Sequence, residues 1–127
     1  MQLNPMSRVV LDCAFTVHTA LGPGLLESTY EVCLLHELRK NGLRAQSQVM
    51  LPVVYDGVTI DAGYRLDILV EDAIILELKA VEKILPVHEA QLLSYLKLSQ
   101  RQLGFLLNFN VRHLKDGIKR MVNQYQE

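Results

Sequence analysis

The chain has 127 residues, half of them hydrophobic, which is enough for one domain with a packed core and too few for two. Its formal net charge of -1, with both signs spread along the sequence, excludes a protein that coats duplex DNA by charge alone. No apolar run is long enough to span a membrane and no signal peptide is visible, so we expect a cytoplasmic protein with no membrane partner. Cys13 and Cys33 lack the spacing of zinc ligands. We expect one domain over residues 1–127.

The first third of the chain predicts two helices. Ser7 can cap a helix over residues 7–21, where apolar side chains recur at helical spacing until Gly22-Pro23-Gly24 stops it. A second helix is expected over residues 25–40, because an apolar stripe runs along this segment and Asn41-Gly42 ends it.

The middle of the chain predicts an antiparallel meander of strands. Residues 46–55 form the first strand, and Asp56-Gly57 is a strong hairpin turn. Extended structure continues over residues 58–60 and again over residues 64–70, with Gly63 as a candidate bulge before the second segment. The next strand covers residues 73–80.

The last third predicts a helix over residues 86–99, a strand over residues 103–109, and a weakly specified helix from residue 111 onward. A helix that joins two strands of one sheet implies a parallel crossover. The expected fold is therefore α/β, with a mixed sheet and helices packed against it.

Three charged side chains lie inside segments that otherwise predict buried strands: Asp67, Glu77 and Lys79. If residues 71–73 form a three-residue loop, Asp67 falls opposite Glu77 and Lys79 is diagonal to Asp67. Two carboxylates ~5 Å apart repel by roughly 3 kcal/mol at an effective dielectric of 20. Either a divalent cation offsets this repulsion, or one carboxylate faces solvent while Lys79 pairs with the other.

Other polar groups fall on faces that otherwise predict core contacts. Glu27 shares a helix face with Tyr30, and the helix dipole alone could explain an acid at that position. Gln91 and Tyr95 are four residues apart on the third helix and share one face, where ordinary core-edge residues would also fit. Four basic residues near the C-terminus predict either a local basic groove or, as the simpler interpretation, a solvated helix face: Arg112, Lys115, Lys119 and Arg120.

Taken in order, these residues match known motifs. Asp67 followed by Glu77-Leu78-Lys79 resembles the core of the PD-(D/E)XK nuclease superfamily. Gln91-Leu92-Leu93-Ser94-Tyr95 is similar to the QxxxY motif of its exonuclease branch, and Gly24-Leu25-Leu26-Glu27-Ser28-Thr29-Tyr30 resembles the motif that names the GxxExxY family. The resemblance covers about residues 9–122 and implies a restriction-endonuclease-like core of order αβββαβ, with an extra N-terminal helix.

The resemblance also implies roles for the matching positions. A divalent metal, Mg²⁺ with Mn²⁺ as the second candidate, would be bound by three carboxylates and one backbone carbonyl: Glu27, Asp67, Glu77 and the Leu78 carbonyl. Lys79 would orient the attacking water or stabilise charge on phosphate, and Gln91 and Tyr95 would position substrate or catalytic groups. Leu66 occupies the place of the proline in the superfamily motif.

Two functions of different classes follow. The favoured one is a Mg²⁺-dependent nuclease that hydrolyses DNA phosphodiester bonds, in exonuclease-like fashion, with the metal lowering the pKa of a bound water. The alternative is a catalytically inactive module that keeps the nuclease fold and binds nucleic acid or a protein partner. The resemblance also admits a homodimer, because small nucleases of this kind often dimerise.

Overall fold

The computed structural model describes residues 2–125. Its helices and strands follow one another along the chain as α1 (Leu3–Leu21), α2 (Glu27–Lys40), β1 (Ala45–Met50), β2 (Val53–Tyr55), β3 (Val58–Ile60), β4 (Arg65–Val70), β5 (Ile74–Lys79), α3 (Pro86–Ser99), β6 (Leu103–Asn108), the 3₁₀ turn η1 (Leu114–Gly117) and β7 (Ile118–Val122). No helix within residues 2–125 combines the length and the apolar character needed to cross a bilayer.

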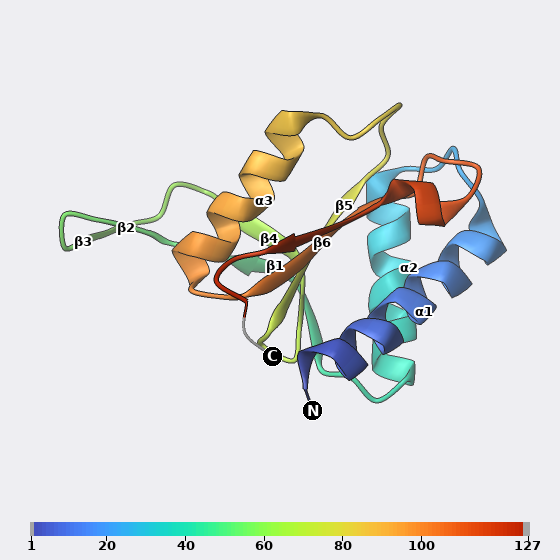
Figure 1. Cartoon of the computed structure of the whole chain (residues 1–127), viewed down its shortest axis with the longest axis horizontal. Helices are drawn as coiled ribbons and strands as arrows, with labels where there is room; N and C mark the ends of the chain where they lie inside the picture. Colours follow the sequence, from blue (N-terminus) through green and yellow to red (C-terminus); the bar gives the residue numbers. More distant parts are fainter. Residues whose placement is uncertain (1, 126–127) are drawn as a thin grey trace.

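Five strands form one mixed sheet in the order β1-β4-β5-β6-β7, and β2 pairs with β3 in a separate hairpin. The β5–β6 pair is parallel and the other neighbours are antiparallel, so α3 makes the parallel crossover that the sequence predicts. In Figure 1, α1 and α2 lie on one side of the sheet and α3 lies on the other. The expected α/β fold with a mixed sheet between helices is confirmed.

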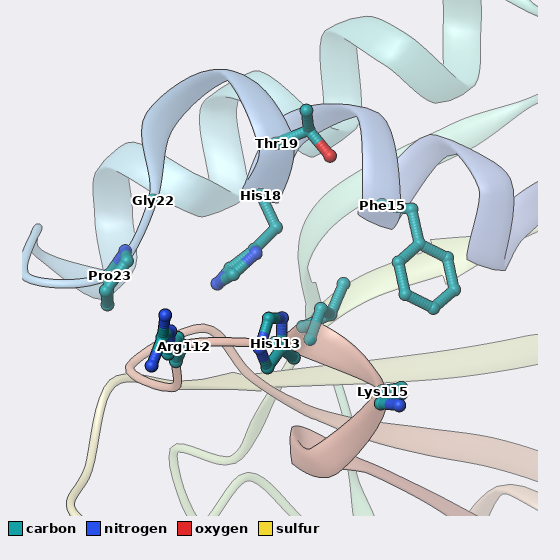
Figure 2. Close-up of a pocket in the computed structure, with 9 residues that line it drawn as sticks. Phe15, His18, Thr19, Gly22, Pro23, Arg112, His113 and Lys115 are labelled. Atoms are coloured by element: carbon teal, nitrogen blue, oxygen red, sulfur yellow. The ribbon is translucent and has the colours of Figure 1, made fainter.

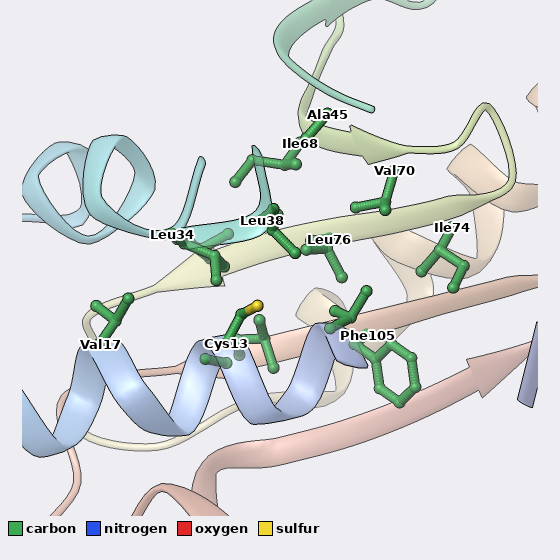
Figure 3. Packing of buried hydrophobic residues seen from close by; sticks show 14 of the residues in the cluster. Cys13, Val17, Leu34, Leu38, Ala45, Ile68, Val70, Ile74, Leu76 and Phe105 are labelled. Carbon is green, nitrogen blue, oxygen red and sulfur yellow. The ribbon is translucent and has the colours of Figure 1, made fainter. Parts of the chain in front are cut away.

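The larger core fills the space between the sheet and the two N-terminal helices (Figure 3). Alternate positions of β5, Ile74, Leu76 and Leu78, point into this core, while Ile75 joins the smaller core beneath α3. Each fully buried Leu or Ile contributes roughly 1.5–3 kcal/mol to the free energy of unfolding. Because β5 is covered on both faces, Glu77 near its carboxyl end is surrounded by protein, while Lys79 at the end of the strand is half-buried.

Both N-terminal helices begin at residues other than those expected. The first starts at Leu3, and Ser7 lies inside it, where the Ser7 hydroxyl donates to the Leu3 carbonyl at 2.7 Å; the predicted Ser7 cap is wrong. The second helix starts at Glu27, two residues later than expected. The Tyr30 hydroxyl explains this delay, because it accepts from the Leu25 amide (3.1 Å) and donates to the Gly22 carbonyl (2.6 Å), which holds the preceding loop.

The predicted strand over residues 46–55 is divided between β1 and β2. The hairpin turn is confirmed, since Asp56 and Gly57 both have positive φ, 52° and 73°, as a type I′ turn requires. Gly63, with φ 81°, lies in a loop between β3 and β4 and not in a bulge. Across these loops β1 pairs directly with β4, and the β2–β3 hairpin projects away from the main sheet (Figure 1).

The C-terminal helix expected from residue 111 is wrong. The chain forms the turn η1 and then β7, which pairs antiparallel with β6 along the edge of the sheet. Gly117 permits this return, because a Cβ atom there would lie 2.2 Å from the Asn108 carbonyl oxygen. The burial of β7 does not alternate, so its sequence lacks the usual signal of a half-buried strand.

Candidate active site

The β4–β5 hairpin has the register that the sequence predicts. Val70 pairs with Ile74, and the next two pairs along the strands end at Ile68 and Leu76. The following position places Asp67 opposite Glu77 at the carboxyl end of β5. The backbone pairing of β4 with β5 ends before this position, and the side chains of Asp67 and Glu77 accept hydrogen bonds from main-chain amides instead.

The two carboxylates form reciprocal hydrogen bonds with the opposite strand. The Asp67 amide donates to Glu77 Oε2 at 2.9 Å, and the Leu78 amide donates to Asp67 Oδ2 at 2.9 Å. Each carboxylate is therefore held by a main-chain N–H across the hairpin, and one oxygen of each remains outside these bonds. This arrangement fixes two carboxyl groups side by side at the edge of a packed core.

Burial makes this pair electrostatically costly. Glu77 is only 4% exposed, and burial first, then the Asp67 charge, raises its pKa to about 8. Burial also raises the pKa of Asp67, although the hydrogen bond from the Leu78 amide and the charge of Lys79 act in the opposite direction. Near neutral pH the metal-free pair therefore retains a proton, and added positive charge would stabilise its ionised form.

Lys79 lies close to the pair without neutralising it. Its charge lowers the pKa of both carboxylates, yet it forms no salt bridge within residues 2–125. Its backbone is fixed, because Lys79 pairs with Asn108 of β6 and its carbonyl accepts from the Phe109 amide at 2.9 Å. The ammonium group is thus available to a ligand that approaches the end of β5.

Glu27 is placed beside the end of β5, apart from the carboxylate pair. One of its oxygens accepts from the Ala80 amide at 3.3 Å, and its charge contributes to the raised pKa of Asp67. Among residues 2–125, no group of three or more His, Cys, Asp or Glu side chains lies close enough to hold one metal ion. The structure therefore gathers two of the three carboxylates, Asp67 and Glu77, that the sequence suggested as ligands.

The third helix brings its polar face over the same site. The Gln91 side-chain amide donates to the Tyr95 hydroxyl at 3.1 Å, as expected from their spacing. Tyr95 is buried, and burial followed by the charge of Glu77 raises its pKa, which places its ring near the carboxylates. The ring of Tyr64 packs at a tilt against that of Tyr95, with 5.9 Å between the ring centroids.

A family model described as the PD-(D/E)XK nuclease superfamily matches residues 4–121. The chain belongs to the PD-(D/E)XK nuclease superfamily. The mixed sheet between helices agrees with the restriction-endonuclease-like fold of that superfamily. No curated protein and no solved structure shows a significant match to the chain.

Two further polar residues of this PD-(D/E)XK domain meet at the site, Glu31 and Gln48. The Gln48 amide donates to both Glu31 carboxylate oxygens, at 3.0 and 3.2 Å, and forms a hydrogen bond that lowers the pKa of Asp67. Burial, followed by the nearby charges of Asp67 and Glu27, raises the pKa of Glu31. Glu31 could have been found from its spacing, because it lies one helical turn after Glu27.

Gln48 carries no such signal in the sequence. It lies within β1, opposite Asp67 in the register of the β1–β4 pair, but its φ is 53°. A residue with a side chain pays about 1–2 kcal/mol for this left-handed conformation, and such residues concentrate at functional sites. The conformation aims the amide of Gln48 at Glu31 on α2.

The donor set fits the divalent metals that PD-(D/E)XK nucleases typically use. The buried Glu77 and the half-buried Asp67 lie side by side, neither forms a salt bridge within the part of the chain that the structure describes, and burial raises the pKa of both carboxyl groups. Mg²⁺ commonly binds through one or two carboxylates and keeps several waters, so Asp67 and Glu77 suffice as its protein ligands.

Proposed function

We propose that this protein is a Mg²⁺-dependent nuclease of the GxxExxY family that hydrolyses phosphodiester bonds of DNA. The observation that carries this proposal is the hydrogen-bonded pair of buried Glu77 and half-buried Asp67, beside Lys79, which forms no salt bridge with a described residue. Mg²⁺, or Mn²⁺ in its place, would be held by Asp67 and Glu77, and it would lower the pKa of a bound water and offset charge on phosphate. Glu27 and the Leu78 carbonyl are the further ligands proposed from the family motif.

The residues of the chain would divide the remaining work. Lys79 would hold the attacking water or the phosphate oxygen that gains charge, since its ammonium group has no carboxylate partner among the described residues. Gln91 and Tyr95 would orient the substrate, because their side chains are bonded to each other above Glu77. This Gln–Tyr pair resembles the exonuclease branch, so we propose a preference for free ends or single strands.

A second candidate function is a catalytically inactive module that binds nucleic acid or a protein partner. The position of Glu27 favours it, because this carboxylate is bonded to the Ala80 amide and the described residues hold no three-carboxylate cluster. The two candidates differ in one measurable property, which is metal-dependent turnover.

The decisive assay compares purified wild type with Lys79→Ala on labelled single- and double-stranded DNA and on RNA, across Mg²⁺ and Mn²⁺ concentrations. We expect Lys79→Ala to abolish turnover and keep metal binding, Glu77→Ala to remove both, and Gln91→Ala and Tyr95→Phe to slow the reaction less. Lys83→Ala is the matched control, since Lys83 is exposed and forms no salt bridge with a described residue. Equal trace activity of wild type and Lys79→Ala would favour the binding module.

A homodimer and a cytoplasmic location belong to the same proposal. Cys13 and Cys33 are both free thiols, which is typical of proteins kept in a reducing compartment. Sedimentation of the purified protein measures the oligomeric state directly, and a single monomeric species at micromolar concentration would contradict the dimer.

A further inference from the structure

A cavity of about 600 Å³ lies between the end of α1 and the segment that joins β6 to β7 (Figure 2). Its walls come from α1, from the loop after it, and from η1 with the residues that precede it: Phe15, His18, Thr19, Gly22, Pro23, Arg112, His113, Leu114 and Lys115. The lining contains an arginine, a lysine and two histidines, and no aspartate or glutamate belongs to it. In Figure 2 the His18 ring points from α1 toward the segment that carries Arg112 and His113.

The cations of this cavity are not neutralised by the protein. Arg112 and Lys115 are exposed and form no salt bridge with any residue from 2 to 125. By contrast, Arg101 beside another cavity is paired with Asp72 at 2.6 Å. The chain as a whole has a net charge of -1, so this local excess of positive side chains is not a general property of its surface. Such a cavity favours an anionic ligand.

The wall that carries these cations is held in place. His18 is buried, and its Nε2 donates to the Val111 carbonyl at 2.8 Å, directly before Arg112. The His18 ring also packs at a tilt against Phe109, with 6.2 Å between the ring centroids. The cavity is therefore anchored from α1 at both Phe109 and Val111.

The same contacts connect the cavity to the candidate active site. Because β5 and β6 are parallel, their carboxyl ends lie together, with Lys79 beside Asn108. The Phe109 amide donates to the Lys79 carbonyl at 2.9 Å, and the Phe109 ring stacks on Tyr30 at 4.6 Å. Tyr30 in turn donates to the carbonyl of Gly22, a residue of the cavity wall. One packed group thus fixes the distance between the cavity and Lys79.

We propose that this cavity binds a phosphate group of the nucleic-acid strand whose neighbouring phosphodiester lies at the Asp67–Glu77 pair. Arg112 and Lys115 supply the charge, and the guanidinium of Arg112 matches the geometry of phosphate oxygens. The identity of the ligand rests on the proposed function, while the cationic cavity itself does not. A phosphate held there orients the strand as it crosses the end of β5.

Binding without turnover tests this site. The metal-free protein is titrated into labelled oligonucleotides, fluorescence anisotropy is recorded at several salt concentrations, and Arg112→Ala/Lys115→Ala is compared with wild type. Arg8→Ala/Lys97→Ala is the control, because it removes the same charge from two exposed positions outside the cavity. We expect only the cavity variant to weaken binding, and to reduce the slope of log K against log salt by about 0.7–1 for the lost phosphate contact.

A charge-retaining exchange, Arg112→Lys/Lys115→Arg, keeps the test independent of folding and should restore most of the affinity. Strands with a 5′-phosphate and a 5′-hydroxyl distinguish the two sources of phosphate. A preference for the 5′-phosphate that disappears in the cavity variant identifies a terminal group, and an equal loss on both strands identifies an internal phosphodiester.

Equal losses in the cavity and control variants, or no binding by wild type at low salt, would overturn the proposal. Its failure is separable from that of the nuclease function. Cleavage that depends on Lys79, together with unchanged binding by the cavity variant, would reject the phosphate site alone. Binding with the expected salt slope, but with no cleavage by wild type, would reject the nuclease alone.

Discussion

Replacing Glu77 by Gln should remove most of the pH dependence of stability of the metal-free protein. In the folded state the pKa of Glu77 is raised to about 8, by burial and by Asp67, from an ordinary value of 4.5. The folded state therefore holds a proton that the unfolded state releases, and this stabilisation is complete below pH 4.5 and lost as the pH rises through 8. At 1.36 kcal/mol per pH unit the full loss is roughly 5 kcal/mol, of which about 3 kcal/mol is lost by pH 7.

Such a loss is a large fraction of a typical stability of about 5–15 kcal/mol, so urea denaturation measures it easily. In the presence of EDTA we expect the wild-type midpoint to fall between pH 5 and pH 8.5, and Glu77→Gln to show a much flatter profile. The neutral amide can still accept the hydrogen bond from the Asp67 amide. Glu82→Gln, at an exposed position, should behave as wild type does. If Glu77→Gln lost as much stability as wild type over this pH range, Glu77 would not have a raised pKa in the folded protein.

Two further predictions concern the same site. Mn²⁺ or Mg²⁺ should raise the melting temperature of wild type, with ~2.7 kcal/mol of stabilisation at a metal concentration 100 times the dissociation constant. Asp67→Asn should melt at a higher temperature than wild type without metal, and its melting temperature should rise little when metal is added. Equal metal-induced shifts of the two proteins in calorimetry would count against a metal site at Asp67. At Gln48, whose φ is 53°, Gly should be more stable than Ala by about 0.5–1 kcal/mol, because it relieves the left-handed strain. At the extended neighbour Gln46 the order should reverse, and the same order at both positions would show that Gln48 is unstrained.

The sequence predicted those parts of the fold that are set by neighbouring residues, namely turn conformations and the register of a short hairpin. Asp56-Gly57 specified its turn through the positive φ that glycine and aspartate tolerate, and the three-residue connection set the register that places Asp67 opposite Glu77. The β7 strand was not predictable in this way. Its pairing depends on the close approach of Gly117 to the Asn108 carbonyl, which is a backbone contact across a turn and leaves no periodic signal.

The candidate site also contains residues that local spacing predicts and residues that only the folded structure brings together. Gln91 and Tyr95 meet because helical spacing alone brings them together. Gln48 joins the site because the register of the β1–β4 pair places it opposite Asp67 and its left-handed backbone turns its amide toward Glu31. Glu27 is still a proposed ligand, and in the structure one of its carboxylate oxygens accepts from the Ala80 amide at the end of β5. A backbone donor of this kind cannot be inferred from side-chain patterns.

The carboxylate pair and the lysine are all contained in residues 67–79, and the bonds that hold the pair run between the two arms of one hairpin. These three side chains are therefore carried by a single contiguous segment. The three-residue connection between β4 and β5 sets their spacing, so an insertion within that connection would move Asp67 away from Glu77. A change in the length of the β2–β3 hairpin, which pairs apart from the main sheet, would leave the spacing as it is.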